Sequence, residues 1–109
     1  MVSCFANEKD AYGKIYFSAP AILGGQVTFT ITMQRGCSQY DNWYYTLYYS
    51  NSYTKQMFHD DNNTTIIRND KNTYTLTLNN ATSTYHKSNI SFVCDQIPID
   101  TVTLDLIGK

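Results

Sequence analysis

The chain has 109 residues and a formal net charge of −1, so it is long enough for one domain with a single core and too short for two. Hydrophobic residues make up 42% and charged residues 16%, a balance that excludes intrinsic disorder, and the sequence has no run of Lys or Arg of the kind that nucleic-acid binders place against phosphates. No apolar stretch approaches the roughly 18 residues of a membrane span. We therefore expect residues 1–109 to form a single globular domain.

Alternation of polar and apolar residues, interrupted by turn residues about every ten positions, runs along the whole chain and is typical of an all-β sandwich or barrel. Ten tyrosines and fourteen threonines also favour sheet over helix. Pro20 and Pro98 fall in expected connections, where a missing N–H costs a sheet nothing. In chain order, the pattern predicts strands at 14–19, 26–33, 42–49, within 50–58 (a short edge strand), at 64–68, at 73–78, up to Cys94, and at 101–107, which gives eight or nine strands and no convincing helix.

The alternation also divides each strand into an inward and an outward side. The inward side of the second predicted strand is odd-numbered, and threonines occupy its outward side. Tyr45 shares the parity of Trp43 and is expected to be in the core with it. The predicted core comprises Val27, Phe29, Ile31, Trp43, Leu76, Phe92, Cys94 and Leu104, with Val102 and Leu106 on the inward side of the last strand.

Four asparagines close together in the sequence lie in N-glycosylation sequons, and these are Asn62, Asn63, Asn80 and Asn89. Their density favours the secretory pathway, where three cysteines would form one disulfide and leave one thiol. The beginning of the chain lacks the charged and apolar regions of a signal peptide, so we expect a mature extracellular domain. The alternative is a cytosolic protein with three inert buried cysteines.

Three stretches are spaced as in a known family. Residues 25–31 (GQVTFTI) are followed by Trp43, in the sequence WYY, and later by Cys94 at the end of a predicted strand. This pattern resembles the variable-type domains of the immunoglobulin superfamily over nearly the whole chain, and the separation of Ile31 from Cys94 leaves room for the extra edge strands of that type. The resemblance implies a two-sheet antiparallel sandwich that belongs to a single-pass cell-surface protein.

The chain also departs from that family. Ile31 stands at the position of the first core cysteine, and Phe92 stands where the family has its corner tyrosine. Ser88 and Ile90 replace the Asp and Gly of that corner, and the last strand lacks Gly-x-Gly. We therefore expect an invertebrate receptor or a diverged viral ectodomain rather than an antigen receptor. In lacking the first core cysteine, the chain is similar to the variable-like allorecognition receptors of colonial hydroids.

The cysteine pairing has two solutions. Cys37 shares the inward parity of Ile31, and it would point toward Cys94 if the second strand ran on. A disulfide needs Cα atoms about 5.5 Å apart, whereas the six residues from Ile31 to Cys37 would span roughly 20 Å as a strand. If Ile31 faces Cys94, as in the family alignment, Cys37–Cys94 therefore requires a shift in register. The alternative is Cys4–Cys37, because in this architecture the N-terminus lies at the same end as the turn after the second strand. We favour Cys37–Cys94, with one cysteine left free.

Catalytic and metal-binding chemistry has little support in the sequence. His59, Asp60 and Asp61 are adjacent on a turn and would point in different directions, which favours a solvated turn over a metal site. His86 is isolated from any carboxylate in the sequence, and no Ser or Cys has a recognisable base partner. We expect neither an enzyme nor a cofactor or metal.

A dense cluster of six tyrosines is the strongest functional signal: Tyr40, Tyr44, Tyr45, Tyr48, Tyr49 and Tyr53. Surface tyrosines can simply serve strand propensity, but they also supply rigid amphipathic area for protein contacts. The predicted contact residues are Tyr40, Tyr44, Thr46, Tyr48 and Lys55, together with the turn at Gln39. Glycans at one pole and one edge would leave this sheet bare.

Two functions follow as alternatives. In the first, the domain binds a protein partner on an apposed cell, with a second copy of itself as one candidate, and so mediates recognition or adhesion. In the second, it is a structural spacer or a secreted or viral decoy whose tyrosines bind nothing.

Overall fold

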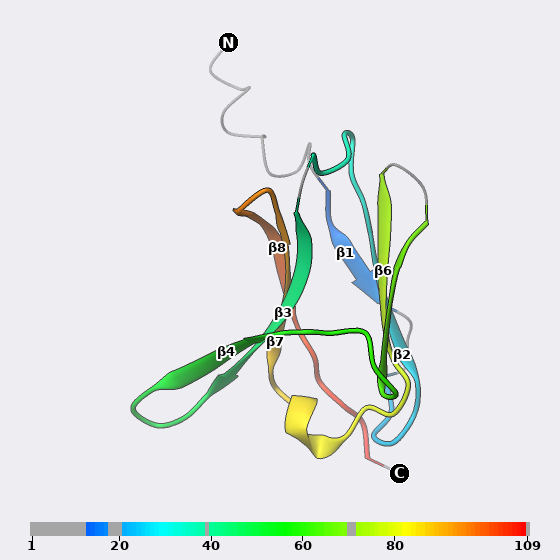
Figure 1. Ribbon diagram of the computed structural model, residues 1–109. Helices are drawn as coiled ribbons and strands as arrows, with labels where there is room; N and C mark the ends of the chain where they lie inside the picture. Colours follow the sequence, from blue (N-terminus) through cyan, green and yellow to red (C-terminus); the bar gives the residue numbers. More distant parts are fainter. Residues whose placement is uncertain (1–12, 18–20, 39, 70–71, 109) are drawn as a thin grey trace.

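The computed structural model describes residues 13–17, 21–38, 40–69 and 72–108, which form eight β-strands and one short 3₁₀ helix (Figure 1). The strands are β1 (Ile15–Phe17), β2 (Val27–Thr32), β3 (Asp41–Tyr48), β4 (Tyr53–Met57), β5 (Thr64–Arg68), β6 (Thr73–Leu78), β7 (Asn89–Cys94) and β8 (Ile97–Thr103), and the helix is η1 (Ser83–Tyr85).

The strands form two sheets of four, in the orders β1-β2-β6-β5 and β4-β3-β7-β8, and every neighbouring pair is antiparallel. The two sheets lie face to face (Figure 1). Phe29 lies opposite Leu76 and Val27 opposite Leu78, so the apolar positions of the first sheet share one side. These observations confirm the predicted all-β, two-sheet antiparallel sandwich.

The core lies between the sheets and centres on Trp43. The Trp43 ring packs 6.4 Å from Phe29 of the opposite sheet and 4.9 Å from Phe92 of its own sheet, measured between ring centroids. All eight residues predicted for the core are buried: Val27, Phe29, Ile31, Trp43, Leu76, Phe92, Cys94 and Leu104. Alternation therefore predicted the inward side of each of these strands correctly.

Tyr45 is the exception in β3, because it is only partly buried and lies at the margin of the core. Its ring packs 4.8 Å from Phe58 and 5.1 Å from Tyr85 between centroids, which forms a small aromatic cluster beside η1. The main core ends at this cluster because the β3–β4 hairpin extends away from the body of the sandwich beyond it (Figure 1).

The last strand begins four residues earlier than predicted. Asp95 and Gln96 both have positive φ, and they form a two-residue turn that leads directly from Cys94 of β7 to Ile97 of β8. Pro98 is therefore inside a strand and not in a connection as predicted, and the strand is at a sheet edge, where proline is tolerated. Leu104 and Leu106 are buried but lie beyond the strand. Pro20 lies outside the described residues.

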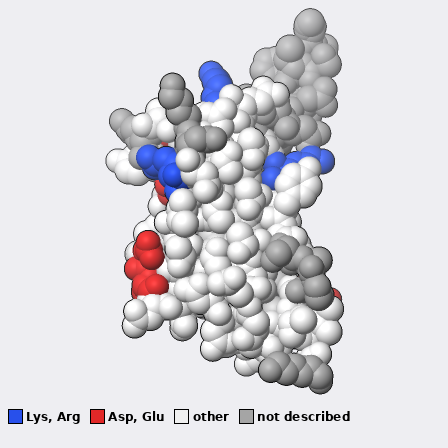
Figure 2. All heavy atoms as spheres, turned by 90° about the vertical axis from the view of Figure 1, so that its right-hand side faces the viewer, with Lys and Arg blue, Asp and Glu red and all other residues white. Residues whose placement is uncertain are grey.

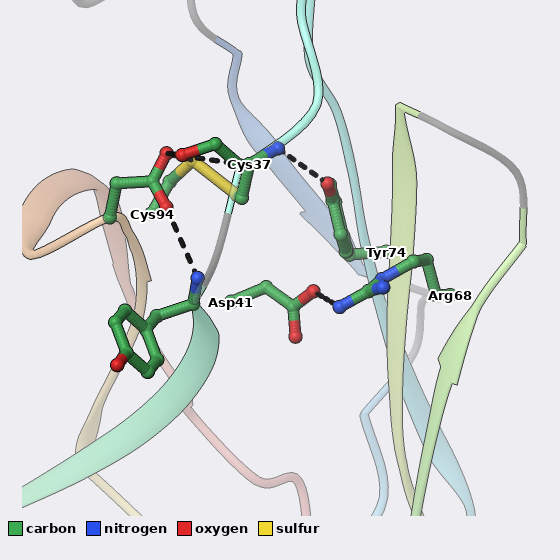
Figure 3. Close-up of a disulfide and its surroundings, with 8 residues drawn as sticks. Cys37, Asp41, Arg68, Tyr74 and Cys94 are labelled. Carbon is green, nitrogen blue, oxygen red and sulfur yellow. Dashed lines mark hydrogen bonds and ion pairs between the residues drawn. A yellow bond between two sulfur atoms is a disulfide. The ribbon is translucent and has the colours of Figure 1, made fainter.

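A disulfide joins Cys37 to Cys94, with the two Cα atoms 5.4 Å apart (Figure 3). Cys37 lies in the connection that crosses from β2 of one sheet to β3 of the other, and Cys94 ends β7, so the bond ties this connection to the end of β7. The favoured pairing is confirmed. This pairing is possible because β2 ends at Thr32. The segment from there to Cys37 is not a strand, so it does not carry Cys37 away from Cys94. Cys4 lies outside the described residues.

Candidate functional site

The outer side of the β4-β3-β7-β8 sheet carries a continuous set of aromatic and uncharged polar side chains. Cross-strand pairing aligns Tyr44 with Met57, Thr46 with Lys55, and Tyr48 with Tyr53. On the other flank of β3, Thr46 lies opposite Asn89 of β7. We call this surface the tyrosine face and define it by Tyr44, Thr46 and Tyr48 of β3, Tyr53, Lys55 and Met57 of β4, and Asn89 of β7.

Contacts within the tyrosine face hold its aromatic rings in place. The Lys55 ammonium lies 4.8 Å from the centroid of the Tyr44 ring, in cation–π geometry. Tyr48 and Tyr53 meet edge to face with their centroids 6.0 Å apart, and each is 61% exposed. The rings of Tyr48 and Tyr53 are therefore already ordered before a partner binds.

Thr46 points outward, as parity predicted, but only 8% of it is exposed. Its neighbours explain the burial, because Lys55 and Asn89 flank it on the adjacent strands. Thr46 therefore offers little surface of its own to a partner, and its role as a contact residue stays a prediction.

Tyr40 is separated from the other predicted contact residues. It precedes β3 and is 55% exposed, whereas Tyr48 ends the strand, roughly 25 Å away along the chain at the usual strand rise. The Asp95 carboxylate accepts the Tyr40 N–H at 3.1 Å, and the Asp95 N–H donates to the Tyr40 carbonyl at 2.8 Å. Tyr40 thus belongs to the disulfide end of the molecule. Gln39 lies outside the described residues.

Sequence reasoning missed Tyr53, Met57 and Asn89 as members of the tyrosine face. Tyr53 belonged to the tyrosine cluster, but its side depends on the β3–β4 register. A turn closed by the Tyr49 N–H and the Ser52 carbonyl, 2.7 Å apart, sets that register. Two or three residues of turn would have suited the sequence equally well, and a shift by one residue would send Tyr53 to the other side.

The disulfide end forms a second polar cluster, shown in Figure 3. The Cys37 N–H donates to the Tyr74 hydroxyl at 2.8 Å, and Asp95 accepts hydrogen bonds from the Ser38 N–H and hydroxyl at 2.8 and 3.0 Å. An ion pair between Arg68 and Asp41 joins the two sheets nearby. These contacts fix the β2–β3 connection against β7.

A hollow of about 290 Å³ lies beside this cluster. Its volume is near the lower limit for small-molecule sites, and it is only partly enclosed. None of the described lining residues combines a nucleophile with an imidazole base. The hollow is lined by Met33, Arg35, Gly36, Ser38, Cys94, Asp95, Ile97 and Ile99.

The residues considered for metal binding lie in the exposed connection between β4 and β5. Asp61 Oδ1 there accepts the backbone N–H groups of Asn63 and Thr64, at 2.8 and 2.9 Å, which is the geometry of a polar turn. Among the described residues no group of three or more His, Cys, Asp or Glu could hold a metal ion. His86, in contrast to the sequence-based expectation, lies near a carboxylate, with Nδ1 3.8 Å from Asp105.

The sequons do not divide between one pole and one edge as predicted. Asn79 donates from its backbone N–H to the Asn63 carbonyl at 2.7 Å and from its side chain to the Asn62 carbonyl at 3.4 Å, so the sites at Asn62, Asn63 and Asn80 lie together. Asn89 lies apart from them, within the tyrosine face. The expectation that glycans would leave this sheet bare is therefore wrong for Asn89.

Charge does not distinguish the outer sides of the two sheets. Figure 2 views the side that carries β1-β2-β6-β5, where the described Lys, Arg and Asp side chains lie near the margins and the middle is uncharged. Threonines dominate there, with Tyr16 and Ile67 as large exposed side chains. The tyrosine face differs in its aromatic content, and Lys55 is the one ionic side chain among its members.

Comparison with known proteins adds no family to these observations. No helix among the described residues is long and apolar enough to span a membrane. A scan against protein-family models matches no family, and a search of curated proteins finds no significant match to the sequence.

Proposed function

We propose that this chain is a variable-type immunoglobulin-like domain of a cell-surface protein, and that it binds a second copy of itself on an apposed cell through the tyrosine face. The order of strands supports the family assignment. Immunoglobulin domains place strands A, B, E and D in one sheet and C, F and G in the other, and variable types extend the second sheet beside C. The orders β1-β2-β6-β5 and β4-β3-β7-β8 correspond to that arrangement.

The observation that carries the proposal is that Tyr48 and Tyr53 are paired and exposed, and that neither side chain contributes to the core. Tyr48 and Tyr53 are mostly exposed, while the buried side of the same sheet is already filled by Trp43, Ile90 and Phe92. Tyrosine offers a large, rigid contact area with little loss of side-chain entropy, and it is enriched at interfaces. The tip of the hairpin, Tyr48-Tyr49-Ser50-Asn51-Ser52-Tyr53, has the Tyr, Ser and Asn composition of antibody contact loops.

A second copy of the domain is the partner that best suits the charge of this surface. Like charges across a symmetric contact repel each other, and the tyrosine face has only Lys55, whose ammonium lies over Tyr44. Hydroxyl and amide groups provide both donors and acceptors, so the same surface can satisfy itself across a two-fold axis. The disulfide and the sequons support an extracellular location.

The affinity of one domain should be low. Four strands about 4.8 Å apart and some 20 Å long present roughly 400 Å² per copy, about half of a standard interface. We therefore expect a dissociation constant in the micromolar range or weaker, with many copies at a cell contact adding avidity.

Sedimentation equilibrium and aggregation of coated beads test the proposal. Tyr48→Ala and Tyr53→Ala should each weaken self-association by about thirtyfold, on the order of 2 kcal/mol, because each removes a large exposed aromatic side chain from the proposed contact. Tyr44→Ala should have a similar effect. Raising the salt concentration should change little, since the contact is mainly aromatic and uncharged.

Tyr16→Ala is the matched control, because Tyr16 is 70% exposed on the outer side of the other sheet. It should leave association unchanged, and Thr73→Ala and Thr75→Ala should do the same. Melting temperatures of the Tyr48 and Tyr53 variants should stay near that of the parent. Equal losses from both sheets would place the contact elsewhere, and an unglycosylated parent that stays monomeric and inert would favour the spacer or decoy function.

A further inference from the structure

Asn89 occupies a different environment from the other sequon asparagines. Asn62, Asn63 and Asn80 are exposed and lie together where β5 begins and β6 ends. Asn89 is half-buried at the start of β7, with Thr46 of β3 opposite it on one side and Thr103 of β8 on the other. Of the described sequons, only this one lies inside the proposed contact surface.

Both polar atoms of the Asn89 side chain have partners within that surface. Nδ2 donates to the Tyr48 hydroxyl at 3.1 Å, and Oδ1 accepts from the Thr103 hydroxyl at 2.8 Å. Nδ2 is the atom that would carry the sugar of an N-glycan. This nitrogen has two hydrogens, and glycosylation replaces one of them with the sugar. The sugar is therefore attached either where the hydrogen bond to Tyr48 is made or immediately beside it.

The distances within a sheet show what a glycan at this position would cover. Adjacent strands are about 4.8 Å apart, so Thr46 lies one strand from Asn89 and Lys55 lies two strands away, within roughly 10 Å. A branched, hydrated glycan is larger than this separation. It would therefore stand between Tyr48 and any approaching surface.

We propose that Asn89 is a regulatory glycosylation site, at which an N-glycan masks the tyrosine face and prevents self-association. Glycans at Asn62, Asn63 and Asn80 leave that face open, because these residues belong to the connections at the ends of β5 and β6. The inference rests on the proposed function. It adds that the occupancy of one sequon sets the fraction of molecules able to bind.

Two substitutions at Ser91, the third residue of the sequon, separate the glycan from the amide that carries it. Ser91→Ala abolishes the sequon and keeps Asn89 with its hydrogen bonds to Tyr48 and Thr103. Ser91→Thr keeps the sequon. Thr82→Ala removes the Asn80 sequon and is the matched control for loss of a glycan elsewhere. All variants are made as the 109-residue chain in a glycosylating secretory host, and the occupancy of each site is measured by peptide mass spectrometry.

We expect Ser91→Ala to self-associate at least tenfold more tightly in sedimentation than the Asn89-glycosylated Ser91→Thr protein, and Thr82→Ala to match its parent. Chemical nitration gives a second readout that needs no binding. The Asn89 glycan should slow nitration of Tyr48 and leave that of Tyr16 unchanged.

Each contrary result has its own meaning. Absence of sugar at Asn89 in protein that is occupied at Asn80, or equal association with and without the Asn89 glycan, would overturn the masking and leave the proposed function intact. If Ser91→Ala and the unglycosylated parent both remain monomeric, the proposed function fails, and the regulation of binding fails with it. Equal nitration of Tyr48 in both forms would overturn the masking geometry.

Discussion

At the scale of single residues, the Tyr74 hydroxyl joins the β1-β2-β6-β5 sheet to the disulfide. It accepts the Cys37 N–H at 2.8 Å, and the Tyr74 side chain is buried against the core. Tyr74→Phe should lower the free energy of unfolding by about 1 kcal/mol, because the ring still fills its site while the amide loses its partner. Urea or thermal unfolding should show this as a fall of about 5 °C in melting temperature.

Tyr49→Phe removes an exposed hydroxyl by the same chemical change and is the control for Tyr74→Phe. Its unfolding should stay within about 0.5 kcal/mol of the parent. If the two variants melt together, the Tyr74 hydroxyl contributes nothing to the stability of this end of the molecule.

Tyr85 gives the fold a dependence on alkaline pH. Burial raises the pKa of the Tyr85 hydroxyl above its ordinary value of 10.0, and Tyr45 and Asp61 raise this pKa further. The unfolded chain therefore releases this proton at a lower pH than the folded chain does. The contribution of Tyr85 to stability is complete below about pH 10 and is lost as the pH rises through the folded pKa.

Tyr85→Phe cannot ionise, so it should lose less unfolding free energy than the parent between pH 8 and pH 11. Urea unfolding at the two pH values measures this loss, and Tyr16→Phe, on the other sheet, is the control. A loss in Tyr85→Phe as large as that of the parent would show that other groups cause the alkaline destabilisation.

The sequence predicted the orientation of single residues correctly where they are buried between the two sheets. Strict alternation identified the inward positions of β2, β6 and β7 because each of these strands packs against the opposite sheet along its length. It could not foresee that Thr46 would be covered from the outside or that Tyr45 would lie at the margin of the core. Both depend on neighbouring strands whose register the sequence does not specify.

At the scale of elements, two turns decide what the sequence left open. The β3–β4 turn at Tyr49–Ser52 sets the cross-strand pairs of the tyrosine face. The β7–β8 turn at Asp95 and Gln96 begins the last strand early and brings Thr103 opposite Asn89. Asp-Gln is not a strong signal for a two-residue turn, in which glycine usually supplies the positive φ, and the sequence therefore suggested a longer connection.

Gln96→Gly should stabilise the β7–β8 turn. Gln96 has φ of 71°, where an L-residue other than glycine pays about 1–2 kcal/mol, and glycine offsets part of this gain by its greater freedom when unfolded. The net gain should be about 0.5 kcal/mol, seen as a rise of about 2–3 °C in melting temperature. Gln96→Ala keeps the unfavourable conformation and should give no rise. A destabilised glycine variant would show that the glutamine side chain has a role in the turn.

At the scale of the whole molecule, the disulfide lies at one end of the sandwich, near the start of β3. The β3–β4 hairpin extends from the sandwich at the other end of β3 (Figure 1). Residue parity pointed to Cys37 and Cys94, but the length of β2 decided whether they could meet. The position of Asn89 is a similar case. Its sequon was visible in the sequence, whereas its place among Thr46, Tyr48 and Thr103 required the pairing of β3, β7 and β8.

Removing the disulfide tests how much the link between the β2–β3 connection and β7 contributes to the stability of the fold. The bond closes a loop with a sequence separation of 57, which in the chain-entropy model stabilises the fold by about 4 kcal/mol. Domains of this size are typically stable by about 5–15 kcal/mol, so the double variant Cys37→Ala/Cys94→Ala should still fold. Its melting temperature should fall by about 15–20 °C, while its far-UV circular dichroism below the transition keeps the sheet spectrum of the parent.

Cys4→Ala is the matched control, because it removes a thiol and leaves the Cys37–Cys94 bond in place. Its unfolding should equal that of the parent, and non-reducing peptide maps of the parent should contain one linked pair, Cys37 with Cys94. A Cys4→Ala variant destabilised as much as the double variant would contradict this pairing. Because the core around Trp43 is complete without the sulfur atoms, the double variant should also retain the register of β3 and β4 and therefore its self-association at low temperature. Loss of that association in a folded double variant would show that the disulfide end, rather than the tyrosine face, makes the contact.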